Sequence, residues 1–124
     1  MAQKLSAAQQ RRVEEIREFE KVVDHVAKLV AELDQSRAAK ALFLENICTV
    51  VAREMSQMRQ RALTANIGTI ADVAGYMSVM AGRGGGLDMK IRGLRDGVNS
   101  LRMQLDHALK VAMTPEKNDS EPAG

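Results

Sequence analysis

The chain has 124 residues, of which 45% are hydrophobic, 27% are charged and only 2% are aromatic. This length allows one domain of modest size, and the apolar content is too high for an intrinsically disordered chain. The scarcity of aromatic side chains argues against a β-sandwich, an aromatic-lined ligand site and a base-stacking RNA-binding module. The net charge of +2 gives no general electrostatic reason to expect a nucleic-acid partner.

The segment from Ala7 to Ala62 contains neither glycine nor proline and is rich in helix-favouring residues. Apolar residues recur there at spacings of three and four, which is typical of seams that pack against another helix. The first seam comprises Ile16, Phe19, Val23, Val26, Val30 and Leu33, and the second comprises Ala41, Leu44, Cys48, Val51, Met55 and Met58. The register slips near Ser36, so either one helix continues with a phase shift or a second helix begins with Ser36 as its cap. We favour one helix over residues 7–62, because no turn-forming residue interrupts it.

The rest of the chain predicts two further helices, over residues 66–82 and 87–113. A glycine run at residues 82–86 separates them, because so much backbone freedom is costly to hold in a helix. The first of these helices carries a face of small residues, with which Gly93 and Gly97 of the last helix would pair. We expect a single helical domain over residues 7–113, a flexible N-terminus over residues 1–6 and a disordered tail over residues 114–124.

These elements predict an all-α fold, an elongated antiparallel hairpin or bundle. A helix over residues 7–62 is too long to find a partner along its whole length within the chain, so the first seam should bury itself against a second copy. The predicted dimer seam consists of Ile16, Phe19, Val23, Val26, Val30 and Leu33. The alternative is a monomeric four-helix bundle, broken near Ser36.

A partner protein is expected to bind a groove of adaptable methionine side chains with a basic rim. The predicted groove consists of Met55, Met58, Met77 and Met80, and the rim of Arg53, Arg59 and Arg61. Residues 37–62 hold five basic and two acidic side chains, so an acidic partner or a phosphate backbone is a further possibility for this segment.

His107 is a candidate phosphoacceptor, because its place relative to the apolar seam turns it, like His25, toward solvent. The stretch His107–Ala112 resembles the His-x-Leu-Lys-Gly-Ala/Ser motif of histidine phosphotransfer domains. It departs from that motif at Val111, where the family has the glycine that leaves room for a docking partner. The resemblance implies phosphoryl transfer to His107.

A second resemblance covers two stretches, Ala39–Cys48 and Asp72–Arg83. They resemble the two helices of the dimerisation hairpin of sensor histidine kinases, Ala-Lys-x-x-Phe-Leu-x-Asn-Met/Ile-Ser and Asp-Ile-Leu-Asp-Phe-Ser-Lys-Ile-Glu-Ala-Gly-Arg. The position of the phosphoacceptor histidine holds Thr49, and the two stretches lie about twenty residues closer than in the family. The resemblance implies a degenerate hairpin that neither phosphorylates nor accepts phosphate at the usual place.

Other chemistry finds little support in the sequence. Histidine and cysteine lack the close spacing of a metal site, no cofactor motif is present, and Cys48 on its seam is better explained as a small buried hydrophobe. The best membrane candidate, residues 62–82, contains Asp72 near its centre. We therefore expect a cytoplasmic, non-enzymatic protein-binding adaptor or regulator, with a phosphorelay component as the alternative and nucleic-acid binding as the third possibility.

Overall fold

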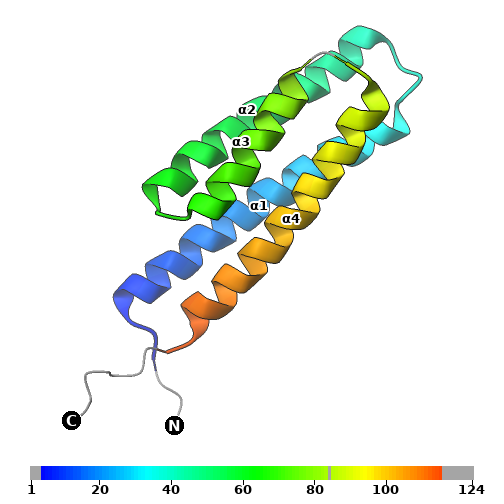
Figure 1. Cartoon of the computed structure of the whole chain (residues 1–124). Coiled ribbons are helices and arrows are strands. Elements are labelled where there is room, and N and C mark those ends of the chain that lie inside the picture. The colour runs from blue at the N-terminus through cyan, green and yellow to red at the C-terminus, as the bar shows by residue number, and fades with distance from the viewer. Residues whose placement is uncertain (1–3, 84, 116–124) are drawn as a thin grey trace, which may run out of the picture.

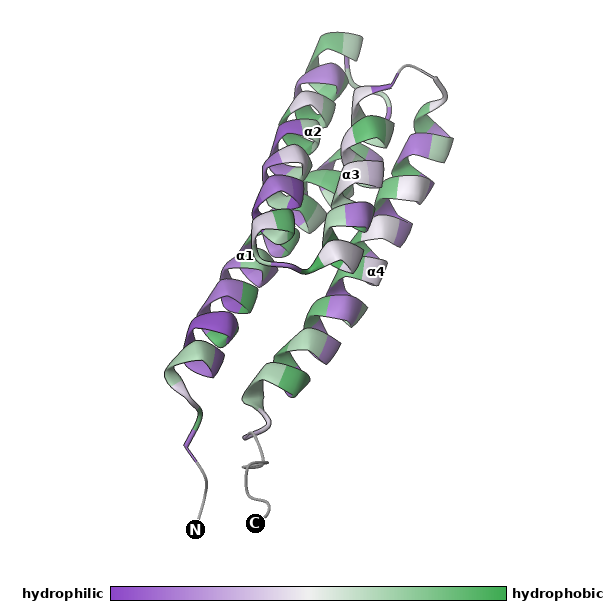
Figure 2. Ribbon diagram, turned by 60° about the vertical axis from the view of Figure 1, so that its left-hand side comes forward, coloured by the Kyte–Doolittle hydropathy of each residue, from purple (hydrophilic) through white to green (hydrophobic). Residues whose placement is uncertain are grey.

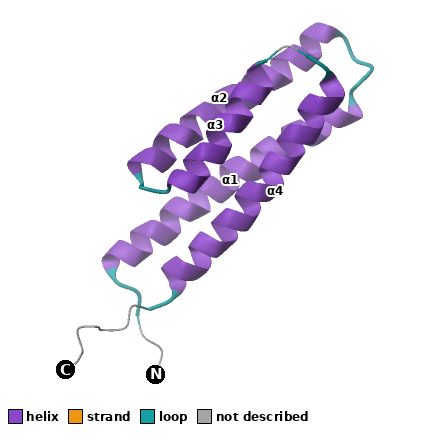
Figure 3. Cartoon of the chain, in the orientation of Figure 1, coloured by secondary structure: helices purple, strands orange, loops and turns teal. Residues whose placement is uncertain are grey.

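The structure is a computed structural model that describes residues 4–83 and 85–115. Its four helices, α1 Ala7–Gln35, α2 Ala41–Thr64, α3 Gly68–Gly82 and α4 Leu87–Met113, form an antiparallel bundle (Figures 1 and 3). In this bundle α1 and α3 each pack against both α2 and α4. The sequence prediction of flexible or disordered ends at residues 1–3 and 116–124 falls outside the described residues.

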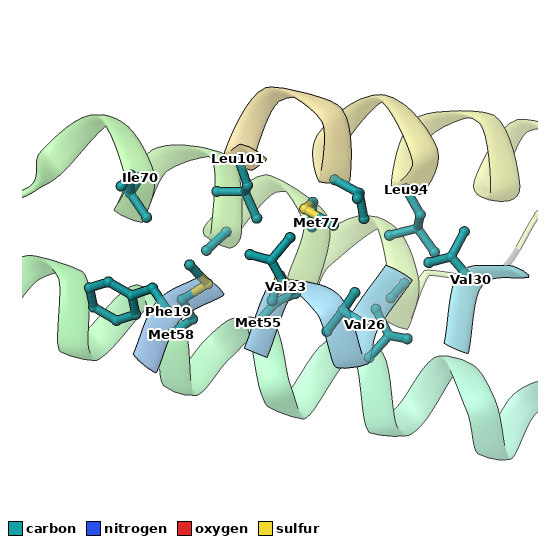
Figure 4. Close-up of a cluster of buried hydrophobic side chains, with 14 of the residues drawn as sticks. Phe19, Val23, Val26, Val30, Met55, Met58, Ile70, Met77, Leu94 and Leu101 are labelled. Carbon is teal, nitrogen blue, oxygen red and sulfur yellow. The ribbon is translucent and has the colours of Figure 1, made fainter. Parts of the chain in front are cut away.

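One apolar core runs along the axis of the bundle. Every helix contributes its apolar face, and the buried residues of the described chain include no charged side chain. Figure 2 shows the hydrophobic faces turned inward and the hydrophilic faces turned outward. Figure 4 shows how side chains from four helices meet in this core: Phe19, Val23, Val26, Val30, Met55, Met58, Ile70, Met77, Leu94 and Leu101.

The favoured prediction of one helix over residues 7–62 is wrong, because α1 ends at Gln35 and α2 begins at Ala41. Ser36 does not cap the second helix either. It ends the first, with its N–H donating to Glu32 O, while Lys40 is the N-cap of α2. The reversal lets both seams face one core, and burial of two apolar faces outweighs the helix propensity of the connecting residues.

The chain turns between α2 and α3 at Asn66, whose φ of 63° lies in the left-handed region. Asparagine tolerates this conformation better than most residues because its short polar side chain hydrogen-bonds locally. The N–H of Ile67 donates to Ala62 O at 2.8 Å, and that of Asn66 donates to Leu63 O at 3.1 Å. These two bonds are those of a Schellman motif, and they fix where the α2–α3 hairpin ends.

Gly93 and Gly97 do allow α3 to approach α4 closely, but their neighbours are not the predicted small residues. A Cβ at Gly97 would lie 2.5 Å from Met77 Cγ, and one at Gly93 would collide with Met80 Sδ. The small face of α3 packs against α2 instead, where Ser78 Oγ donates to Ala52 O at 2.9 Å. Long side chains from α3 therefore fill the space left by the glycines of α4.

Candidate binding groove at the open end of the bundle

The four helices differ in length, and the difference opens one end of the bundle. α1 has 29 residues and spans about 44 Å, whereas α3 has 15 residues and spans about 22 Å. At the end that holds the α2–α3 turn, α1 and α4 continue past it (Figure 1). We call this the open end.

A groove of about 1270 Å³ lies at the open end. Its walls are the first turns of α1, the last turns of α4 and the start of α3, and we call it the end groove. It is lined by Ala8, Gln9, Arg12, Ile16, Asn66, Ile67, Thr69, Ile70, Met103, Gln104, His107, Ala108, Val111, Ala112, Thr114 and Pro115. Small-molecule pockets span about 300 to 1,000 Å³, so the end groove offers more room than most such ligands fill.

The first turn of α1 is held in place by Ser6 and Gln9. Ser6 Oγ accepts from Gln9 N at 3.1 Å, and Ser6 N donates to Gln9 Oε1 at 3.0 Å, which together make a capping box. The same Gln9 side chain reaches α4, since its Nε2 donates to Thr114 O at 2.6 Å. This hydrogen bond joins the two walls of the end groove at its outer end, which we call the mouth.

Arg12 closes the bottom of the groove on the side of the α2–α3 turn. It lies one helical turn before Ile16, on the side of α1 that carries the apolar seam. Its guanidinium donates to Ala65 O at 2.7 Å and to Glu15 Oε1 at 3.1 Å. The first bond satisfies a carbonyl at the end of α2, which has no partner within its own helix. A positive charge therefore stands where the core meets the groove.

Gln104 forms part of the α4 wall and is incompletely bonded. Its Nε2 donates to Ser100 Oγ at 3.0 Å, whereas its buried Oε1 finds no hydrogen-bond partner in the part of the chain that the structure describes. Buried acceptors without a partner are uncommon in native proteins and call for an explanation.

Both histidines are exposed, as the sequence predicted. His107 lies at the rim of the end groove on α4, and His25 lies on α1 outside it. Val111, one turn after His107, is 60% exposed.

The predicted methionine groove is wrong. Met55, Met58 and Met77 are buried in the core, and only Met80 of the predicted set is partly exposed, lying over Gly93. At helical spacing these residues are core side chains, because they continue the apolar seams of α2 and α3.

The three arginines of the predicted rim do not share a surface. The Arg59 side chain lies on Gly75 of α3, with its Cδ 3.0 Å from the place where a Cβ would stand. Arg61 covers the Phe19 ring of α1 at 5.3 Å from the ring centroid, within the range of a cation–π contact. Because these two residues contact different neighbouring helices, Arg59 and Arg61 do not belong to one basic rim, while Arg53 is exposed.

All six residues of the predicted dimer seam are buried within the single chain, in contact with the other helices of the bundle. The seam had been assigned to a dimer because a long first helix would have left it without a partner. Since α2 and α4 cover it, that reason does not apply. Cys48 on the second seam is also buried, and this burial raises the pKa of its thiol.

The end groove was not predicted from the sequence, although two features of the sequence pointed to it. The predicted lengths of the helices already differed, and the apolar lines of α1 and α4 change character at their ends. Arg12 takes a place that a large apolar residue holds elsewhere in α1, and Ala108 and Ala112 take such places in α4. Small or charged side chains at these positions leave the end of the core unfilled.

Comparison of the chain with models of protein families, with curated proteins and with solved structures finds no match. The resemblance to a histidine-kinase hairpin therefore stays a hypothesis that rests on residues 39–48 and 72–83. Among the described residues, no helix is both long and apolar enough to cross a bilayer, and no three potential metal ligands cluster.

Proposed function

We propose that this protein is a non-enzymatic binding protein that takes up a helix of a partner protein in the end groove. The observation that carries the proposal is the position of the groove on the line of α3. At mid-bundle, α1 packs against α2 and α4, and α4 packs against α1 and α3, whereas beyond the α2–α3 turn the places of both α2 and α3 are vacant. A helix laid at the start of α3 would cover the side chains of α1 and α4 that line the groove there.

The chemistry of the lining supports a helix with one apolar face. The floor is made by Ile16 and Ile70 of the core, and the walls add Met103, Ala108 and Val111. Small and flexible side chains of this kind accommodate different apolar faces. Met103 and Val111 are 73% and 60% exposed, so a bound helix would remove apolar surface from water.

Binding can be measured with a synthetic probe, an 18-residue peptide acetylated at its N-terminus and amidated at its C-terminus. Its leucines recur at spacings of three and four, and alanine and glutamine fill the other positions. Titration of the ¹⁵N-labelled protein should shift the backbone amides of the first turns of α1 and the last turns of α4. A peptide of the same composition in scrambled order should not bind.

Substitutions at two equally exposed valines test where on the protein the peptide binds. Val111→Glu places a charge in the groove and should weaken peptide binding about tenfold or more. Val79→Glu, at a residue that is also 60% exposed but lies on α3 outside the groove, should leave binding unchanged. Equal loss in both variants, or amide shifts confined to other surfaces, would contradict the proposal.

A second candidate function, phosphoryl transfer to His107, is favoured by the exposed position of this side chain beside a docking groove. A neutral imidazole nitrogen would attack the phosphorus of an aspartyl phosphate, forming a P–N bond as the bond to the carboxylate oxygen breaks. Incubation with a phosphorylated receiver domain should then give an acid-labile phosphate on the protein. His107→Gln should abolish it, whereas His25→Gln, at an exposed histidine in a similar Asp-His-x-x-Lys context, should not.

A further inference from the structure

We infer that this protein forms a two-fold dimer in which the exposed face of α3 packs antiparallel to the same face of a second copy. The inference goes beyond the proposed function, because it concerns the side of the bundle and not the end groove. It also concerns a different surface from the seam of α1 that the sequence predicted, which is buried in the core.

The exposed face of α3 is poor in charge. Its middle holds Tyr76 and Val79, whose exposed fractions are 54% and 60%. Asp72 is the only charged residue of this helix, and Figure 2 shows the ribbon of α3 mostly in white and green. The exposed face of α1, in contrast, carries paired acidic and basic side chains. A helix that faces solvent normally shows a polar outer face, so the apolar face of α3 indicates a contact with a partner.

The apolar surface continues from α3 onto α4. The hydroxyl oxygen of Tyr76 is 3.6 Å from the place where a Cβ of Gly93 would stand, and the Met80 side chain covers the same glycine. One turn before Gly93 on α4 lies Met89, which is 75% exposed. Because Gly93 places no side chain between the two helices, Tyr76 and Met80 can lie across the boundary beside Val79.

The exposed residues of α3 follow a two-fold order. Asp72 precedes Tyr76 by four residues, and Arg83, the C-cap, follows Val79 by four residues. At 3.6 residues per turn, these four positions share one side of the helix. When a second α3 lies antiparallel across the midpoint between Tyr76 and Val79, Tyr76 of each copy faces Val79 of the other. Asp72 of each copy then faces Arg83 of the other, which is the reciprocal pattern of an isologous interface.

The two charges select both the partner and its direction. Asp72 and Arg83 are eleven residues apart, about 16 Å along the helix, so they cannot pair within one molecule. Neither forms an ion pair with any other residue that the structure describes. Antiparallel packing sets each beside its opposite charge, whereas parallel packing would bring like charges together. A second copy is therefore the partner whose charges this face matches.

The dimer is expected to be weak and to leave the end groove accessible. α3 spans about 22 Å, so the contact covers only a few turns and belongs to the smallest class of specific interfaces. The end groove lies at the start of α3. Because the two α3 helices run in opposite directions, the two end grooves lie at opposite ends of the dimer.

Sedimentation equilibrium measures the association directly. Between about 10 μM and about 1 mM protein, the mass should rise from 13.6 kDa toward twice that value. Val79→Glu places a charge at the centre of the contact and should weaken dimerisation about tenfold or more. Val111→Glu, in the end groove, should leave dimerisation unchanged although it weakens peptide binding. Circular dichroism checks that both variants stay helical.

Exchange of charges tests the two-fold order. Asp72→Arg alone and Arg83→Asp alone each set like charges opposite one another, so each variant should dimerise about fivefold less tightly or worse. An equimolar mixture of the two should form heterodimers, because opposite charges then face each other at both ends of the contact. The double variant should regain the affinity of the original protein. A mass that stays at 13.6 kDa in the original protein overturns the inference, and so do single variants that dimerise normally or a mixture that does not recover.

Discussion

The two ends of the bundle hold their helices together by different means. At the end where α1 turns into α2, which we call the elbow end, Asp34 pairs with Arg37 and Arg95, and Arg37 also pairs with Asp88 at the start of α4. At the open end Gln9 Nε2 donates to Thr114 O, and the end groove lies between the ends of α1 and α4. The elbow end is held by the chain connection between α1 and α2 and by ion pairs between helices. At the open end, no other helix covers the residues of α1 and α4 that line the groove.

This difference shows that unequal helix lengths can leave apolar surface uncovered at one end of a bundle. The apolar faces of α1 and α4 do not stop where α3 begins, so the same positions that form the core in mid-bundle become groove walls past Gly68. The bundle requires only that the α2–α3 hairpin ends before α1 and α4 do.

The largest expected effect comes from the core on the elbow side. Leu94→Ala removes a fully buried side chain and should lower the free energy of unfolding by roughly 3 kcal/mol, because a cavity is left behind. Met103→Ala, at the rim of the groove, should change it by less than about 0.5 kcal/mol. Urea denaturation followed by circular dichroism measures both. Similar losses for the two variants would show that the open end is packed in solution.

A smaller effect on the free energy of unfolding is expected at the N-cap of α1, which lies at the open end. Ser6→Ala removes both the acceptor for Gln9 N and the capping box, and should cost about 1 kcal/mol. Amide hydrogen exchange in the first turn of α1 should quicken, while exchange at the elbow end stays the same. Ser56→Ala on the exposed face of α2 is the control, with an expected change within about 0.5 kcal/mol.

The smallest effect concerns the charges of the elbow end. The hydrogen bond from Arg37, aided by that from Arg95, lowers the pKa of Asp34 below its ordinary value of 3.8, against a smaller opposing effect of desolvation. A depressed pKa stabilises the fold above pH 3.8, and this contribution is lost as the pH falls from there through the folded-state pKa. Asp34→Asn should flatten the acid limb of a plot of unfolding free energy against pH. Asp72→Asn on α3 should not, and an unchanged limb in Asp34→Asn would refute the assignment.

Sequence periodicity predicted which faces are buried because that property depends on each helix alone. All six residues of the first seam are buried, although against the other helices of the same chain and not against a second copy. The apolar residues of α4 that recur at spacings of three and four from Ile91 to Leu105 are buried as well. For the second seam, the prediction of a buried face is confirmed from Cys48 onward, whereas Ala41 is exposed and Leu44 is only partly buried. These two residues lie next to the reversal, where the core ends.

The break after Gln35 was not predictable from local propensity. Its connecting residues include no glycine or proline, and the chain reverses there because tertiary burial outweighs continuation of the helix. The end groove was missed for a related reason. It depends on which helices lie side by side and where each one stops, and neither follows from the pattern within a single helix.

The bond between Gln9 and Thr114 also bears on how the protein can be handled. It places Ser6 and Thr114, where the chain enters and leaves the bundle, beside the mouth of the end groove. A tag or reporter domain fused near either position would begin at that mouth and compete for the groove. A circular permutant that joins these two ends by a short linker and opens the chain between Gln35 and Ala41 moves both fusion points to the opposite end, because the elbow lies there.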